Sequence, residues 1–471
     1  MIKFGTDGWR AVIAEDFTFD NVRACAQGVA NYLKQAKLSE RGLVIGYDTR
    51  FASEDFAAAA AEVIAGNEIN VHLCSQPAPT PVISYAVTAT QSVGAIIITA
   101  SHNPGSWNGF KYKDDTGASA PTELVTEIER NTNEILSTGG VKRLPLAEGV
   151  DSQVIAYLDP APAYGKHLER LVGLEVLRRS RLKIIVDSMY GAGIGYFKTL
   201  LQGGEIEVIE INSERNPLFP GIQPEPIAKN LTKLSSLIKA RKADVGLATD
   251  GDADRIGVVD EKGEFLNQHQ VFALLALYFL EVCGERGAII KTLTSTDMLY
   301  RLGELFDVPV YETAVGFKYV APLMMEKDAF IGGEESGGYG FRGHVPERDG
   351  ILAGLYFLDF MLKTGKTPSQ LLGYLYGKVG PHYYDRLDFH ISPDEHQTLL
   401  KNITRNPVNS IAGIKVTKLD TTDGFRHLLA DDSWLLIRFS GTEPLVRIYA
   451  ESYSPEQVQK LLDSGRKLLG I

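Results

Sequence analysis

Residues 94–104 read Gly-Ala-Ile-Ile-Ile-Thr-Ala-Ser-His-Asn-Pro. The uninterrupted apolar run predicts a buried strand, because a strand covered on both faces needs no polar alternation. This strand delivers Ser101 to a loop just before Asn103-Pro104. Loops on the ends of buried strands carry much of the chemistry of α/β enzymes. Ser101 is therefore a candidate nucleophile or phosphate carrier, and a local cap is the structural alternative.

Similar strands recur along most of the chain. Strand-like apolar runs lie at 43–47, 183–187, 244–248 and 288–291, and segments with helical spacing lie between them. Repeated alternation of strands and helices predicts sheets that are largely parallel, with the helices as crossovers. We therefore expect several α/β units along the chain.

The last part of the sequence has a different pattern. After Gly380-Pro381, two strand-like runs at 435–438 and 446–449 precede a helix from about Pro455. This pattern is typical of a smaller α+β domain. We therefore predict an α/β fold of three similar mixed α/β sheet domains and a C-terminal α+β domain. The predicted domains are 1–150, 151–260, 261–378 and 379–471.

The net charge of the chain limits the classes of ligand that it is expected to bind. The chain has 471 residues, 44% of them hydrophobic, and a formal net charge of -11. Affinity for nucleic acid comes largely from Lys and Arg, so this charge argues against a general nucleic-acid binder. An anionic small substrate stays compatible with it. Salt screens charges beyond roughly 8 Å, so a local Arg/Lys cleft can dominate the field inside it.

The cysteines and the apolar runs indicate a compartment. Cys25, Cys74 and Cys283 are far apart and form no CxxC pair, so neither structural zinc nor a disulfide framework is expected. The first residues lack the apolar region of a signal peptide. The longest apolar run, Val271 to Leu280, is too short to cross a bilayer. These features predict a cytoplasmic protein without a membrane partner.

Residues 250–255 read Asp-Gly-Asp-Ala-Asp-Arg and follow the run at 244–248. In an extended loop alternate side chains point the same way, so three carboxylates converge. Converging carboxylates need a cation, and an oxygen-only set without histidine favours Mg²⁺ or Ca²⁺ over Zn²⁺. An EF-hand would need a glycine at its sixth position, where this chain has Arg255. The structural alternative is a polar turn between Ala248 and Ile256.

Two further loops combine glycine with polar groups. Residues 332–338 read Gly-Gly-Glu-Glu-Ser-Gly-Gly, which suits hydrogen bonding to a polyol such as a sugar. Residues 438–444 read Arg-Phe-Ser-Gly-Thr-Glu-Pro, and with Arg447 nearby they could form a phosphate cradle. A surface turn and a hairpin turn with an incidental arginine are the respective structural alternatives.

In order and spacing, these four loops resemble those of the α-D-phosphohexomutase superfamily, and the chain looks most like a bacterial-type phosphoglucomutase. The combination of Thr-Ala-Ser-His-Asn-Pro at 99–104 with Asp-Gly-Asp-Ala-Asp-Arg at 250–255 carries the resemblance. It covers essentially the whole chain. The resemblance implies four domains around a central cleft, each contributing one loop. It also implies a monomer or weak homodimer that binds a small sugar phosphate.

The resemblance implies roles for the catalytic residues. Ser101 would carry the phosphoryl group and, with Asp250, Asp252 and Asp254, bind one Mg²⁺. The other implied catalytic residues are Arg10, His102, Lys111 and Arg255. Among them Lys111 is linked to proton transfer and Arg255 to the phosphoserine region. An exposed lysine after a turn and a structural histidine are the plain alternatives for Lys111 and His102.

The resemblance also implies the substrate contacts. Glu334 and Ser336 would hold sugar hydroxyls. Lys318 would contact a phosphate, with an ordinary lysine at a helix start as the alternative. The implied phosphate site of the last domain contains Arg438, Ser440, Gly441, Thr442 and Arg447.

The implied reaction moves a phosphoryl group between the 1- and 6-positions of a hexose. Phosphorylated Ser101 would donate its phosphoryl group to one end of the sugar phosphate. The resulting hexose 1,6-bisphosphate, which is both primer and intermediate, would turn over and return its other phosphate. Glucose phosphates are the expected substrates, with mannose phosphates as a second pair. The reason is that Gly338 replaces the histidine frequent in family members that use mannose or glucosamine.

Other activities stay open on the sequence alone. A phosphoglucosamine or phosphomannose mutase would share the same four loops. A serine- and metal-dependent sugar-phosphate phosphatase would hydrolyse the phosphoserine instead of passing it on. A non-catalytic sugar-phosphate sensor would need neither Ser101 nor Lys111.

Overall fold

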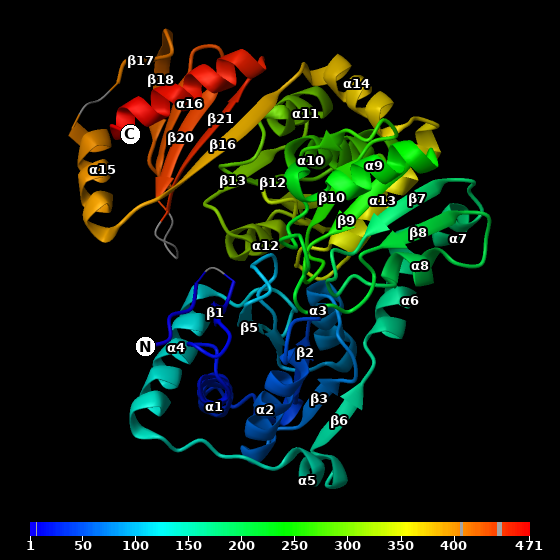
Figure 1. Cartoon of the computed structure of the whole chain (residues 1–471), viewed down its shortest axis with the longest axis vertical. Coiled ribbons are helices and arrows are strands. Elements are labelled where there is room, and N and C mark those ends of the chain that lie inside the picture. The colour runs from blue at the N-terminus through cyan, green and yellow to red at the C-terminus, as the bar shows by residue number, and fades with distance from the viewer. Residues whose placement is uncertain (6, 406–407, 440–444) are drawn as a thin grey trace.

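The computed structural model describes residues 1–5, 7–405, 408–439 and 445–471, which form four sheets (Figure 1). Three sheets follow one another through the body of the molecule, and the orange and red end of the chain forms a fourth that stands to one side. The predicted class, three mixed α/β units and a C-terminal α+β unit, is confirmed. No helix in these ranges is long and apolar enough to cross a membrane.

The first sheet carries the Ser101 loop. Its strands lie in the order β1 (Trp9–Val12), β5 (Trp107–Lys113), β4 (Ala95–Ile98), β2 (Leu43–Tyr47), β3 (Val71–Cys74) and β6 (Ile155–Leu158). Its helices are α1 (Phe19–Gln35), α2 (Ser53–Gly66), α3 (Thr80–Thr90), α4 (Thr122–Thr138) and α5 (Leu146–Asp151). Because β6 pairs with β3, the first sheet extends to Leu158, beyond the boundary predicted at residue 150.

The second sheet carries the aspartate loop. Its strands lie in the order β11 (Phe265–Leu266), β10 (Ile256–Val259), β9 (Val245–Thr249), β7 (Lys183–Asp187) and β8 (Glu207–Ile211). Its helices are α6 (Ala161–Leu171), α7 (Leu174–Arg178), α8 (Tyr196–Leu201) and α9 (Thr232–Arg241). Because β11 lies beyond residue 260, this sheet also extends past its predicted end.

The third sheet carries the Glu334 loop. Its strands lie in the order β13 (Val310–Thr313), β12 (Ile289–Thr292), β14 (Ile331–Gly333) and β15 (Tyr339–Phe341). Its helices are α10 (Gln268–Leu277), α11 (Met298–Phe306), α12 (Phe317–Glu326), α13 (Gly350–Thr364) and α14 (Pro368–Val379). Asp349 caps α13, since its Oδ1 accepts a hydrogen bond from Leu352 N at 2.8 Å.

The fourth sheet pairs all its strands antiparallel. The order is β16 (Tyr383–His390), β21 (Leu445–Ser452), β20 (Trp434–Phe439), β19 (Phe425–Leu429), β18 (Ile414–Asp420) and β17 (Ser410–Ile411). Its helices are α15 (Pro393–Arg405) and α16 (Pro455–Leu469). This unit has its own apolar core, whereas a single core cluster runs through most of the other three units.

One local rule places the candidate loops. In each of the first three sheets, a strand that pairs in parallel is followed by a strand that returns antiparallel beside it: β4 by β5, β9 by β10, and β14 by β15. The Ser101, aspartate and Glu334 loops are the connections of these three returning pairs. Each loop therefore leaves the carboxyl end of a buried strand, the edge of α/β sheets that binds ligands.

Candidate active site

Ser101 is held in an unusual backbone conformation at the end of β4. Its φ is 52°, in the left-handed region that residues with a side chain rarely adopt, and the residue is 1% exposed. Its Oγ donates a hydrogen bond to Asp250 Oδ2 at 2.9 Å, and its N–H donates to Thr99 Oγ1 at 2.9 Å. Strained backbone persists only where its surroundings enforce it, and such sites cluster at active sites.

Arg50 supplies that enforcement, a role that was not predicted from the sequence. The guanidinium is fully buried, pairs with Asp48 at 3.1 Å and donates hydrogen bonds to four carbonyl oxygens of the Ser101 segment. The shortest of these reaches Ser101 O at 2.6 Å. Arg50 therefore fixes the course of the loop. The available sequence signal was its position just after a strand, in Asp48-Thr49-Arg50.

The aspartate loop meets the Ser101 loop directly. Asp250, Asp252 and Asp254 are fully buried, and one carboxylate oxygen of each lies within 4.8 Å of the others. A Cβ on Gly251 would lie 2.2 Å from Ser101 O, so only glycine allows the two loops to come this close. Burial, with the neighbouring carboxylates of Asp254 and Asp252, raises the pKa of Asp250 well above its usual range.

This carboxylate set fits a hard divalent cation. Within the described residues, Asp252 Oδ1 and Asp254 Oδ1 are buried and accept no hydrogen bond. Buried carboxylate oxygens without a donor are costly unless a cation satisfies them. Oxygen ligands from three aspartates and a serine hydroxyl are of the type that Mg²⁺ and Ca²⁺ bind. The predicted convergence of the three aspartates is confirmed.

Lys111 lies beside the same carboxylates. It is 1% exposed, and its Nζ lies 2.7 Å from Asp7 Oδ2 and 2.8 Å from Asp252 Oδ2. Burial works against its charge, but the carboxylates of Asp252 and Asp7 outweigh burial and raise its pKa. The alternative of an exposed lysine is therefore wrong. Lys111 is a buried ammonium within reach of the aspartate loop.

His102, Arg255 and Arg10 separate these groups from the open cavity. His102 Nδ1 lies 3.4 Å from Ser101 Oγ, and burial together with the charges of Arg255 and Arg10 holds the pKa of His102 well below its usual range. The imidazole is therefore neutral at pH 7. Arg255 Nε lies 3.7 Å from Asp254 and 3.9 Å from Asp250, and Arg10 donates to Asn103 at 2.9 Å.

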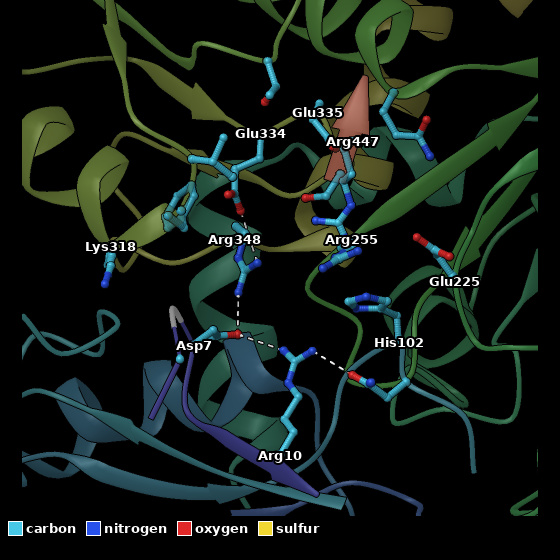
Figure 2. A pocket seen from close by; sticks show the side chains of 18 of the residues that line it. Asp7, Arg10, His102, Glu225, Arg255, Lys318, Glu334, Glu335, Arg348 and Arg447 are labelled. Carbon is cyan, nitrogen blue, oxygen red and sulfur yellow. Dashed lines mark hydrogen bonds and ion pairs between the residues drawn. The ribbon is translucent and has the colours of Figure 1, made fainter. Parts of the chain in front are cut away.

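A cavity of about 750 Å³ opens in front of His102 and Arg255 (Figure 2). The predicted residues on its wall are Arg10, His102, Arg255, Lys318, Glu334, Ser336, Arg438 and Arg447. They come from all four units, as expected for a central cleft. Ser440, Gly441 and Thr442 lie outside the described residues.

The cavity wall is cationic although the chain is acidic. Among the described residues, eight Lys and Arg line it against five Asp and Glu, while the whole chain has a formal net charge of -11. A cleft lined mainly by one sign of charge concentrates ligands of the opposite sign. The wall therefore suits a ligand with one or two phosphates.

Arg348 is the most connected of these cations, and it was not predicted from the sequence. Its guanidinium lies 2.7 Å from Asp254, 3.0 Å from Asp7, and 3.2 Å from both Glu334 and Glu347. It thereby joins the N-terminal segment, the aspartate loop and the Glu334 loop. The available signal was the charged run Glu347-Arg348-Asp349 immediately before an apolar helix.

The phosphoglucomutase/phosphomannomutase family matches almost the whole chain. The matches are its alpha/beta/alpha domain I at residues 1–138, domain II at 162–263, domain III at 267–379 and its C-terminal domain at 398–467. The four matches follow the four sheets in order.

Individual relatives agree with the family match. A Thermococcus kodakarensis protein named phosphoglucomutase/phosphomannomutase is 32% identical, over 99% of this chain and 98% of its own. A Pyrococcus abyssi protein named "Probable phosphoglucosamine mutase" is 31% identical, over 99% and 97%. A solved structure from Thermus thermophilus, named "putative phosphomannomutase", superposes with a TM-score of 0.86 at 37% identity, and the match covers 99% of both chains. The chain belongs to the phosphoglucomutase/phosphomannomutase family of the α-D-phosphohexomutase superfamily and is an isomerase that acts as a hexose-phosphate mutase.

Proposed function

We propose that this enzyme interconverts glucose 1-phosphate and glucose 6-phosphate through a phosphoserine at Ser101, with mannose phosphates as a second substrate pair. The observation that carries the proposal is the position of the Ser101 hydroxyl. It donates a hydrogen bond to Asp250, one of three converging carboxylates, and its neighbour His102 lines a cationic cavity wide enough for a sugar phosphate. The pair Glu334-Glu335 and the small Gly338 favour glucose within the family.

The proposed cofactor is one Mg²⁺ bound by Asp250, Asp252, Asp254 and an oxygen on Ser101. When bound, it would neutralise the phosphoserine and the charge that develops during transfer. The buried carboxylate oxygens without hydrogen-bond donors support this assignment. Arg255 adds a fixed positive charge on the cavity side of the same carboxylates.

The proposed transfer exchanges one bond to phosphorus for another. The bond from phosphorus to Ser101 Oγ breaks as a bond to the attacking sugar hydroxyl oxygen forms. Lys111 gives a proton to the released Ser101 Oγ and takes one from the sugar hydroxyl, so its charge is unchanged at the end. Its buried position between Asp7 and Asp252 keeps it protonated before the step. The second half-reaction runs the same exchange in reverse from the other phosphate.

Both ends of the sugar must reach Ser101, so the other residues must hold it in two orientations. Glu334 and Ser336 are the proposed hydroxyl contacts and lie on the cavity wall. Lys318, Arg438 and Arg447 line the wall as cations for the phosphate that is not reacting. By sequence, Ser440, Gly441 and Thr442 complete this phosphate site. The hexose 1,6-bisphosphate is the proposed intermediate and primer. We expect a monomer or weak homodimer in the cytoplasm.

The decisive experiment compares the wild type with Ser101→Ala. Glucose 1-phosphate is supplied with Mg²⁺ and glucose 1,6-bisphosphate, and both isomers and free phosphate are followed by ³¹P NMR. We expect glucose 6-phosphate from the wild type and no detectable isomerisation by the variant. Isomerisation by Ser101→Ala near the wild-type rate would contradict the proposal. Sustained phosphate release by the wild type without isomer would indicate a phosphatase instead.

A further inference from the structure

Arg348 connects the aspartate loop to the Glu334 loop: its guanidinium lies 2.7 Å from Asp254 and 3.2 Å from Glu334. It lies between Glu334 and Asp7, with the Glu334 loop on one side and the first sheet on the other (Figure 2). The residue is 4% exposed, and its guanidinium carbon lies 5.7 Å from the centre of the Phe317 ring. A buried guanidinium with carboxylates on several sides is a fixed charge, because Arg does not lose its proton in proteins.

The loop that binds the sugar is shaped around the Arg348 stem. Glu334 N donates to Gly338 O at 3.1 Å, which closes the loop that carries Glu334 and Ser336. A Cβ on Gly338 would lie 2.4 Å from Arg348 Cδ and 2.9 Å from its Cγ. The stem therefore fills the space that any side chain at residue 338 would need. The arginine stem at residue 348 therefore requires glycine at residue 338.

The Arg348 charge also alters what Glu334 can bind. Glu334 Oε2 lies 3.2 Å from Arg348 Nη1, so its charge is already compensated by the protein. Two other acids of the wall are compensated in the same way, Glu335 by Arg386 at 3.2 Å and Asp7 by Lys111 at 2.7 Å. A sugar hydroxyl can still donate a hydrogen bond to Glu334. A ligand ammonium, by contrast, would meet the guanidinium as a like charge.

We propose that Arg348 is a specificity-determining residue: by neutralising Glu334 inside a cationic cavity, it admits hexose phosphates that bear only hydroxyls and excludes 2-amino-sugar phosphates. The 2-amino group of glucosamine 1-phosphate is an ammonium at neutral pH, and like charges brought together in a desolvated site suppress binding. The inference rests on the proposed mutase function and assigns its substrate class. It separates this chain from an amino-sugar mutase built on the same fold.

The test compares a variant that lacks the positive charge at residue 348 with one that keeps it. Arg348→Met removes the charge and keeps a flexible stem, whereas Arg348→Lys keeps the charge. The measured quantity is the ratio of kcat/KM for glucosamine 1-phosphate to kcat/KM for glucose 1-phosphate. Loss of general positioning lowers both values and cancels in the ratio. We expect Arg348→Met to raise the ratio by about tenfold and Arg348→Lys to leave it near the wild-type value.

Two controls separate charge from size. N-acetylglucosamine 1-phosphate is larger than glucosamine 1-phosphate but carries no ammonium, so its ratio to glucose 1-phosphate should not rise in Arg348→Met. In the wild type, the glucosamine ratio should rise as increasing pH removes the ammonium proton, while the N-acetylglucosamine ratio stays flat. An equal rise for both sugars in Arg348→Met, or no rise for glucosamine, would overturn the proposal.

The proposed function and the role of Arg348 can fail separately. If Arg348→Met turns over neither sugar, dissociation constants of the two sugar phosphates measured by calorimetry give the corresponding ratio, with the same expected rise. A wild type that does not isomerise glucose 1-phosphate refutes the proposed function. A wild type that does so, yet accepts glucosamine 1-phosphate equally well, refutes only the role of Arg348.

Discussion

The two ends of the cavity are built differently. At the end proposed to react, here called the reacting end, Ser101 and Lys111 are each 1% exposed and are held by buried hydrogen bonds and ion pairs. At the proposed phosphate-holding end, Arg438 and Arg447 keep 12% and 22% of their side-chain surface exposed. Bond breaking tolerates little displacement of the reacting groups, whereas holding a phosphate depends mostly on the number of cations near it. Substitutions at the first end should therefore act on kcat, and those at the second on KM.

The packing of the units follows the same division. The first three share one core cluster, and α13 of the third packs against β9 and β10 of the second. A Cβ on Gly354 of α13 would lie 2.7 Å from the Phe197 ring, so the helix sits tightly on its neighbour. The C-terminal unit has a core of its own. The loops of the reacting end thus extend from a shared core, and the proposed phosphate contacts of the last unit come from a unit with its own core.

The largest effect is expected for Ser101→Ala. Without the hydroxyl no phosphoserine forms, so kcat should fall by about 10⁴-fold or more, measured with glucose 1-phosphate and the bisphosphate primer. The matched control is Ser137→Ala, on the exposed face of α4, which should keep full activity. The thermal midpoints of both variants should stay close to that of the wild type. Equal kcat values for the two variants would contradict the division between the ends.

Asp252→Asn should be next in size and should affect stability as well. The change leaves the Lys111 ammonium without one of its two close carboxylates, and removing one partner of a buried pair costs about 3–5 kcal/mol. We expect a kcat loss of about 10²–10³-fold together with a lower urea midpoint. Asp20→Asn, whose side chain is 94% exposed, serves as the control. Full stability of Asp252→Asn would show that Lys111 is not held by this pair.

Arg438→Met tests the phosphate-holding end. Arg438 lines the cavity and pairs with Asp423 at 2.9 Å. Loss of one charge-assisted contact should raise KM for glucose 1-phosphate by about tenfold with little change in kcat. Arg301→Met removes a cation of α11 that pairs with Asp432 and does not line the cavity, so it should leave KM unchanged. A fall in kcat without a rise in KM would contradict the assignment of Arg438 to the phosphate-holding end of the cavity.

The sequence predicted the Ser101 and aspartate loops because each follows a strong strand signal and contains residue types that have a chemical purpose. Ser101 follows an apolar run, and the three aspartates alternate in a short loop. That the loops meet in one cleft was expected only from the resemblance to the family. The register of the sheets and the extent of β6 were not predicted, because edge strands are short and carry a weak pattern.

Arg50 and Arg348 could not be found in this way. Their importance depends on carbonyls and carboxylates that are distant in the chain, such as Trp107 O for Arg50 and Asp7 for Arg348. A buried arginine has the same local sequence context as an exposed one, so only the fold distinguishes them. The same holds for Lys111, whose exposure the sequence left open.

A smaller effect, on the free energy of unfolding, is expected from a double-mutant cycle at Gly338 and Arg348. This cycle tests whether the two residues pack as one unit. Gly338→Ala forces its Cβ against Arg348 Cδ, and overpacking of this kind costs about 1–3 kcal/mol. The same change in an Arg348→Ala background meets no stem and should cost much less. The free energy of unfolding of all four proteins, measured in urea, gives the coupling. Additive costs would show that the stem and the glycine are independent.

The smallest expected effect is on stability and concerns the histidine contacts next to the Arg348 segment. His344 Nε2 lies 3.0 Å from Asp349, and His167 Nε2 lies 3.0 Å from His344 Nδ1, so α6 is tied to the start of α13. Burial, with the nearby His344 and Arg170, lowers the pKa of His167 from 6.5 to about 4. Between these two values the unfolded chain binds a proton that the folded chain does not. His167 therefore costs stability progressively as pH falls from 6.5 toward 4, and nothing further below that.

His167→Gln removes this titration while keeping a side chain that can form hydrogen bonds. The wild type should lose more stability than the variant between about pH 7 and pH 4, as read from the difference in their urea midpoints at each pH. Acid titration of carboxylates is common to both proteins and cancels in that difference. If the contact supports only the start of α13, the ratio of kcat/KM for glucosamine to glucose phosphates should not move in His167→Gln, in contrast to Arg348→Met. A shift in that ratio would mean that sugar selection depends on the placement of the Arg348 segment as well as on its charge.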